Sequence, residues 1–197
     1  RALMHYYRTC LQRLVFSSGQ GKTLLIKSTN SSGAVASILE AFPDARFITI
    51  FRDPADSIAS SISLMMPALK AHSPEISQDG DVSRDYAALS TAWYKYLYDF
   101  AAERPASQMY TVDYRHLVKD PRGTVEAIYR NFGWEISAEY SARLDGQQQR
   151  QKTYQSGHRY RLEDFGVDRE SIYAELSHVL AARGFVRADP AAESGRT

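Results

Sequence analysis

Apolar residues recur at three- and four-residue spacing in six segments of the chain, and this period is typical of amphipathic helices. The first segment, residues 3–15, opens the chain, and the longest, residues 82–103, carries many aromatic side chains. The other four helical segments are residues 34–42, 53–64, 122–133 and 168–183. Short apolar runs predict strands at three places, residues 23–27, 46–51 and 108–114.

The alternation of predicted strands and helices indicates an α/β fold with a parallel sheet. The first strand, the helix after it and the second strand are predicted to form a βαβ unit with a right-handed crossover. Residues 65–81, rich in Pro, Ser and Gly, predict a long loop, and the polar residues 137–157 predict a loop or a loosely formed helix. We therefore expect a single domain over residues 1–186, followed by a disordered tail at residues 187–197.

Several predicted helices carry recognisable end signals. Ser31 or Ser32 is placed to cap the helix at residues 34–42, and Asp53 is placed to cap the helix that begins with the next residue, a proline. Asp168 and Gly184 mark the start and the end of the last helix. These residues set the helix boundaries that we expect.

Composition narrows the class of protein. The 197 residues are 44% hydrophobic, as in a globular domain. The 24 basic and 23 acidic residues leave a net charge of +1, which is too balanced for a protein that binds nucleic acid through a basic surface. We therefore expect no nucleic-acid partner, and the oligomeric state stays open.

The sequence says less about the cellular compartment. Its one cysteine, Cys10, excludes an internal disulfide, which fits the cytosol and equally a secreted domain without disulfides. No apolar run approaches the roughly 18–20 residues of a membrane helix. A cytoplasmic location is our expectation. The chain begins inside a helical pattern and without Met, so we expect a longer protein whose N-terminus could carry a signal or anchor.

One short motif resembles a nucleotide-binding loop but lacks its context. Gly21, Lys22 and Thr23 match the end of a P-loop, yet Phe16 stands where the first glycine is required. The predicted order is helix, turn, strand, whereas a P-loop lies between a strand and a following helix. We interpret this segment as a connection between two elements.

The junction at Arg52 carries a stronger signal for a phosphate site. Arg52 ends the predicted strand at residues 46–51, where ligands bind to open parallel sheets. The next helix directs free N–H groups to the same region, and a guanidinium can bind phosphate oxygens in a bidentate way. The local pattern equally fits a surface ion pair with Asp53 or Asp56.

A family resemblance favours the phosphate site. The segment FPDARFITIFRDPADSIASS is similar to the 3′-phosphate-binding segment of sulfotransferases that use 3′-phosphoadenosine 5′-phosphosulfate (PAPS), with Arg52 at the strand end and Ser60 eight residues later. The segment LLIKST resembles the family's Lys-Ser-Pro type motif at Lys27 and Ser28.

Two later segments extend the resemblance, in the family's order, over roughly residues 5–186. DYRHLVKDP resembles the Tyr-Glu-Asp-Leu segment and places Tyr114 where the family contacts adenine. GHRYRLEDFG, with His158 and Arg159, is similar to a basic segment that closes over the cofactor in bacterial relatives.

The resemblance implies a P-loop-NTPase-like sulfotransferase fold and transfer of a sulfuryl group from PAPS to a hydroxyl or amine acceptor, without a metal. Lys27 would neutralise charge on the bridging oxygen. Arg52 and Ser60 would hold the 3′-phosphate, and Tyr114 would contact the adenine. His158 and Arg159 would cover the cofactor.

Two departures from the family pattern matter. The phosphosulfate loop that opens the family's domain has no counterpart here, so we expect a truncated chain, without the first strand, that is inactive alone. The positions after Lys27 hold Thr and Ser where many members have a catalytic His, so no general base is assigned. His72, His116 and His158 are weaker candidates for that base.

A related nucleotide kinase and a non-catalytic adenosine-bisphosphate-binding protein remain alternative functions, and the identity of the acceptor is open.

Overall fold

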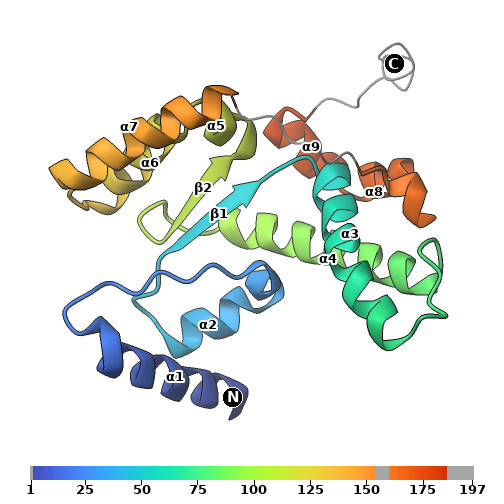
Figure 1. Cartoon of the computed structure of the whole chain (residues 1–197), viewed down its shortest axis with the longest axis horizontal. Coiled ribbons are helices and arrows are strands. Elements are labelled where there is room, and N and C mark those ends of the chain that lie inside the picture. The colour runs from blue at the N-terminus through green and yellow to red at the C-terminus, as the bar shows by residue number, and fades with distance from the viewer. Residues whose placement is uncertain (1, 154–159, 186–197) are drawn as a thin grey trace.

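The computed structural model describes residues 2–153 and 160–185, and Figure 1 shows how its helices surround a short central sheet. In chain order the elements are α1 (Ala2–Leu14), a π-helical turn (Val15–Gly19), a 3-10 turn (Thr29–Ala34), α2 (Val35–Ala41), β1 (Phe47–Phe51), α3 (Pro54–His72), α4 (Asp81–Ala102), β2 (Met109–Asp113), α5 (Tyr114–Lys119), α6 (Pro121–Phe132), α7 (Ala138–Thr153), a 3-10 turn (Leu162–Phe165), α8 (Arg169–Glu175) and α9 (Ser177–Arg183).

The sheet of the described residues consists of β1 and β2, which pair in parallel. The register sets Phe47 opposite Met109 and Phe51 opposite Asp113, so both strands end at the same edge. Two strands that run in the same direction need a crossover connection, and α3 and α4 supply it. The α/β fold with a parallel sheet, expected from the sequence, is confirmed.

Each face of the sheet contributes to a different hydrophobic core, because successive strand residues point to opposite faces. Phe51 packs into the larger core, which is built from α3, α4, α8, α9 and the 3-10 turn before α8. Val112 points to the other face and packs with Ile128 and Phe132 of α6. The sheet thus joins the two cores and positions its carboxyl edge between them.

The strand predicted at residues 23–27 is absent. These residues are irregular and exposed, and Leu25 has 82% of its surface in contact with solvent. An apolar run becomes a strand only where a neighbouring strand supplies hydrogen-bond partners, and in the described residues β1 pairs with β2 alone. The predicted βαβ unit is therefore wrong in its first strand.

The turn that carries Gly-Lys-Thr does not have P-loop geometry. Gly21 adopts a left-handed conformation with φ of 72°, and the Lys22 amide donates to the carbonyl of Gly19 at 3.0 Å. Irregular chain follows until Thr29, so this turn does not lead directly into a helix as a P-loop does. The interpretation as a connection is confirmed, although the element after it is not a strand.

The loop predicted at residues 65–81 begins later than expected. Helix α3 continues to His72 with Pro67 inside it. Met66 is buried in the larger core, whereas Pro67 lies on the solvent side, where water can bond the carbonyl that proline leaves unpaired. Packing of the buried face therefore outweighs the local preference of proline.

Other helix boundaries also differ from the sequence prediction. Neither Ser31 nor Ser32 caps α2: their hydroxyls donate to Ser28 and to Thr29 within the preceding 3-10 turn, and the N-cap position is Ala34. Helix α5 was not predicted. The polar segment is helical over α7, and the last helix is divided at Leu176 into α8 and α9.

Three predicted end signals are confirmed. Asp53 caps α3 and Asp168 caps α8 through their side chains, and Gly184 ends α9 with φ of 62°.

The expected tail at residues 187–197 lies outside the described residues. In the described part of the chain, no helix is long and apolar enough to cross a bilayer.

Two glycines at helix ends allow a test of the packing between distant segments. Gly133 and Gly166 share the left-handed conformation, but an added Cβ meets open space at Gly133 and the backbone oxygen of Asp79, at 2.5 Å, at Gly166. Gly133→Ala should lower the free energy of unfolding by about 1–2 kcal/mol. Gly166→Ala should cost at least ~1 kcal/mol more, because a backbone carbonyl must move. Urea unfolding of both variants measures this difference, and equal costs would contradict the contact.

Candidate functional site

The corner between β1 and α3 is built by a helix cap. Asp53 follows the last residues of β1, and its Oδ1 accepts hydrogen bonds from the amides of Ala55 at 2.9 Å and Asp56 at 3.4 Å. Pro54 takes the first helical position, where its missing N–H costs nothing. This local sequence therefore starts α3 at the carboxyl edge of the sheet, with the positive end of its dipole there.

Arg52 and Tyr114 meet at this edge because of the strand register. Phe51 and Asp113 are opposite one another, so the residues that follow them leave the sheet side by side. The guanidinium carbon of Arg52 lies 5.2 Å from the centre of the Tyr114 ring, within the range of a cation–π contact. The register thus brings together an arginine and an aromatic ring that are far apart in the sequence.

The charge of Arg52 is only partly compensated. Its Nη2 atom lies 3.2 Å from Oδ2 of Asp56, one turn into α3, and the two side chains are 39% and 53% exposed. An exposed ion pair of this kind contributes about 0–1 kcal/mol. A ligand with stronger negative charge can therefore compete with Asp56 for the guanidinium.

A cavity of about 430 Å³ lies directly against this pair. Its lining residues come from the end of β1, the start of α3, helix α5 and the end of α9: Arg52, Asp53, Asp56, Tyr114, Arg115, Val118 and Phe185. This cavity is our candidate site.

The other arginine of the cavity is held by the protein. Arg115 donates to both carboxylate oxygens of Asp113, and its remaining N–H groups reach the carbonyls of Gly184 at 2.9 Å and Arg183 at 2.8 Å. Its guanidinium also lies 4.7 Å from the ring centre of Phe185. The hydrogen bonds from Arg115 hold the pKa of Asp113 below its usual range. Arg115 thus ties the end of α9 to β2, and Arg52 is the lining arginine left for a ligand.

Asp53 is tied to a distant part of the chain as well. The hydroxyl of Tyr173, on α8, donates to both oxygens of the Asp53 carboxylate at 3.0 Å. Tyr173 is only 2% exposed, and its burial, together with the charge of Asp53, raises the pKa of its hydroxyl. The carboxylate that caps α3 is therefore bonded from two sides.

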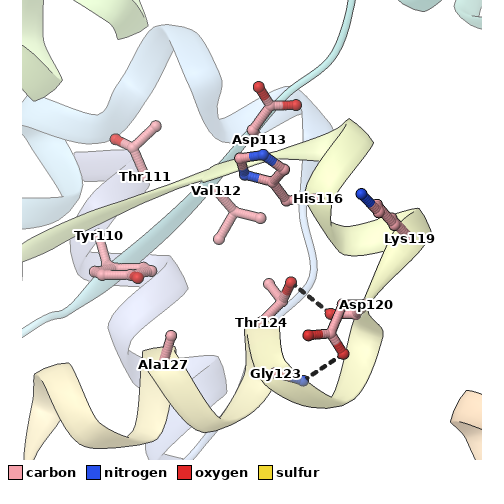
Figure 2. A pocket seen from close by; sticks show the side chains of 10 residues that line it. All are labelled: Tyr110, Thr111, Val112, Asp113, His116, Lys119, Asp120, Gly123, Thr124 and Ala127. Atoms are coloured by element: carbon pink, nitrogen blue, oxygen red, sulfur yellow. Dashed lines mark hydrogen bonds between the residues drawn. The ribbon is translucent and has the colours of Figure 1, made fainter.

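A second cavity, of about 350 Å³, is lined by residues of β2, α5 and α6 and is shown in Figure 2. Strand β2 contributes residues 110–113 to the lining, and α5 contributes His116 and Lys119. The side chain of Asp120 caps α6 and accepts a hydrogen bond from the amide of Gly123 at 2.9 Å. None of the residues predicted to form the phosphate site lines this cavity, so we do not assign the site to it.

The structure brings together two of the predicted site residues, Arg52 and Tyr114. Ser60 lies on α3, half-buried, and does not line the cavity. Lys27 lies in the irregular, exposed segment before the 3-10 turn and does not line the cavity either. His158 and Arg159 lie outside the described residues.

Sequence reasoning missed several neighbours of the site. Asp56 was named only as a possible ion-pair partner, and Arg115, Tyr173 and Phe185 were not named at all. A charged residue directly after a predicted strand is a usable signal for Arg115, but nothing local distinguishes Tyr173 from any other core tyrosine. Within the described residues, no group of three or more His, Cys, Asp or Glu side chains is arranged to hold a metal ion.

Comparison with known proteins assigns the family. Residues 2–139 match the family model described as "Sulfotransferase family", which is more than half of the chain. The chain belongs to the sulfotransferase family. Two curated sulfotransferases, named omega-hydroxy-beta-dihydromenaquinone-9 sulfotransferase Stf3 and found in Mycobacterium bovis and Mycobacterium tuberculosis, are each 26% identical to it over 112 residues. The match covers 57% of this chain and 29% of each relative, so the chain spans less than a third of their length.

Solved sulfotransferase structures share the fold. Sulfotransferase STF9 from Mycobacterium avium superposes with a TM-score of 0.78 at 19% identity, covering 91% of this chain and 46% of that one. Sulfotransferase STF1 from Mycobacterium tuberculosis gives a TM-score of 0.59 at 24% identity, covering 80% of this chain and 40% of that one. At these identities the likeness establishes the sulfotransferase fold alone.

The two aspartate caps allow a test of the Tyr173 bond. Asp53 and Asp168 both cap helices through their side chains, but of these two only the Asp53 carboxylate also accepts a hydrogen bond from a buried tyrosine. Asp168→Ala should lower the free energy of unfolding by about 1 kcal/mol, the cost of a lost cap. Asp53→Ala should cost about 1–3 kcal/mol more, because it also leaves a buried hydroxyl unpaired. Chemical unfolding of both variants measures the difference. If the two costs are equal, the tyrosine bond contributes nothing.

Proposed function

We propose that this chain forms the nucleotide-binding part of a sulfotransferase that moves a sulfuryl group from PAPS to a hydroxyl or amine acceptor. The observation that carries the proposal is the pairing of Arg52 with Tyr114 at the carboxyl edge of the sheet, against a cavity of about 430 Å³. Ligands of open parallel sheets bind at this edge. A guanidinium beside an aromatic ring fits a nucleotide that carries phosphate and a base.

In this proposal Arg52 binds the 3′-phosphate. Its planar fork matches two phosphate oxygens, and the N-terminus of α3 adds favourable potential at the same corner. The carboxylate of Asp53 opposes an anion less than a free carboxylate would, because helix amides and the Tyr173 hydroxyl already bond to it. Ser60 is proposed as a further hydroxyl donor from α3, although it does not line the cavity.

Tyr114 is proposed to pack against the adenine. It is the first residue of α5, and its ring is partly exposed on the cavity side of Arg52. Stacking of a base on an aromatic side chain contributes about 1–3 kcal/mol. His158 and Arg159 are proposed to cover the bound nucleotide, and no metal is proposed.

The sulfuryl end of the donor has less support in the chain. We propose that Lys27 neutralises charge on the bridging oxygen, as in-line transfer depends mainly on positioning and charge stabilisation. Lys27 does not line the cavity, so it would have to approach the bound donor from its exposed segment. We therefore expect this chain alone to bind the desulfonated nucleotide without transferring sulfate, and we propose no general base.

A non-catalytic adenosine-bisphosphate-binding protein is the second candidate. It is favoured because Lys27 is not among the residues that line the cavity. A radiolabelled sulfate-transfer assay separates the candidates when it is run on the intact protein that contains this chain. Transfer to any hydroxyl or amine acceptor supports the enzyme, and nucleotide binding without transfer supports the second candidate.

The phosphate assignment can be tested with adenosine 3′,5′-bisphosphate. Arg52→Ala should weaken its binding about tenfold or more, because a charge-assisted contact of about 1.5–3 kcal/mol is lost. Lys22→Ala is the matched control, since Lys22 is a turn residue of the Gly-Lys-Thr motif away from the cavity. Calorimetry on the wild-type chain and both variants gives the affinities.

Two results of that experiment would contradict the proposal. A larger loss for Lys22→Ala would place the phosphate site at the Gly-Lys-Thr turn. A wild-type chain that binds ATP as well as adenosine 3′,5′-bisphosphate would show that the 3′-phosphate is not recognised.

Substitution of Asp56 should strengthen nucleotide binding, whereas substitution of Arg52 should weaken it. Its carboxylate pairs with Arg52 in the free protein and must give way to the phosphate. Asp56→Asn should therefore strengthen binding of adenosine 3′,5′-bisphosphate by about two- to fivefold, as expected for an exposed ion pair of at most ~1 kcal/mol. The gain should shrink at high salt, because screening weakens exposed charges. Weaker binding by Asp56→Asn would mean that Asp56 supports the site.

A further inference from the structure

Two tyrosine hydroxyls from different helices converge on the corner that carries Arg52. Tyr94, on α4, donates a hydrogen bond to the backbone carbonyl of Arg52. Tyr173, on α8, donates to both carboxylate oxygens of Asp53 at 3.0 Å. The two bonds therefore hold consecutive residues, one through its backbone and the other through its side chain.

Both tyrosines are anchored in the larger core. The ring of Tyr94 packs edge-on against Phe51, with ring centres 5.2 Å apart, and Tyr173 is almost fully buried beside α3. A buried hydroxyl that loses its partner costs about 1–3 kcal/mol, so these bonds persist in the folded protein. Burial and the nearby negative charge of Asp53 raise the pKa of both hydroxyls, so each remains a donor near neutral pH.

The side chain of Arg52 has little else to hold its direction. Among the described residues, its side-chain partners are the exposed Asp56 and the ring of Tyr114, which also lies at the surface. Where the guanidinium points therefore depends on the backbone of Arg52 and on where α3 begins. Those are the two features that the tyrosine hydroxyls hold.

We propose that Tyr94 and Tyr173 are positioning residues of the phosphate site, which aim the Arg52 guanidinium into the cavity without touching the ligand. This inference rests on the function proposed above. The two bonds connect the site to α4 and α8, so the direction of Arg52 is set by helices outside the cavity lining. Misplacement of a reacting group by about 1 Å can lower a reaction rate about 100-fold. Loss of one tyrosine hydroxyl should disturb the position of Arg52 less than that, so we expect a smaller loss of affinity.

The test compares two ligands that differ only in the 3′-phosphate. Tyr94→Phe and Tyr173→Phe keep the ring and remove the hydroxyl. Each should weaken binding of adenosine 3′,5′-bisphosphate about fivefold and leave binding of adenosine 5′-monophosphate nearly unchanged, because only the former reaches Arg52. Calorimetry gives both affinities, and urea unfolding gives the stability of each variant.

A matched control lies on the same helix. Tyr98 is one turn farther along α4, and its ring also packs against Phe51, at 5.9 Å between centres. In the described part of the chain its hydroxyl makes no hydrogen bond. Tyr98→Phe should therefore change neither affinity. In an Arg52→Ala background, Tyr173→Phe should cause no further loss of adenosine 3′,5′-bisphosphate binding, because the group that it positions is gone.

The outcomes separate this inference from the function on which it rests. A wild-type chain that binds both nucleotides equally would refute the phosphate site itself. A wild-type preference for the bisphosphate that survives both Phe variants would overturn the positioning role. An equal loss for both nucleotides, or a loss that persists in the Arg52→Ala background, would assign the tyrosines to general stability and also overturn it.

Discussion

The parallel pairing of β1 with β2 is the constraint on which the rest of the site depends. Its register sets Phe51 opposite Asp113, so the two residues that follow, Arg52 and Tyr114, emerge at one edge. A register shifted by one residue would turn every side chain of a strand to the other face. Phe51 would then leave the core that anchors the Arg52 corner, and the cation–π pair would be lost.

The proposed anion-binding site has two carboxylates, Asp53 and Asp56, in its lining. Asp53 is bonded by helix amides and by Tyr173, so its charge serves the helix cap. Asp56 pairs with Arg52 only at the surface, where such pairs are weak. Arg115 compensates Asp113 and joins α9 to β2. The guanidinium of Arg52 is therefore available to bind a phosphate, whereas the other charged groups nearby are bonded within the fold.

Family membership and geometry support different parts of the functional proposal. The match over residues 2–139 establishes that the chain belongs to the sulfotransferase family. The cavity at the carboxyl edge accounts for the nucleotide end of the proposed donor, since it holds an arginine, an aromatic ring and a helix N-terminus. The sulfuryl end depends on Lys27, which lies outside that lining. The chain covers less than half of the solved sulfotransferases that share its fold.

The sequence by itself determined the elements whose signals are local. The cap at Asp53, the start of α3, the cap at Asp168 and the glycine that ends α9 follow from side chains a few residues apart, and Arg52 follows as the residue at the end of an apolar run. Tertiary structure decided what depends on distant partners. Residues 23–27 have the composition of a strand but no strand beside them, and Pro67 stays helical because Met66 is buried. Arg115, Tyr173 and Phe185 join the site only because α5, α8 and the end of α9 pack around the corner. Local hydrogen bonds can be read from neighbouring residues, whereas strand pairing and side-chain convergence exist only once the chain has folded.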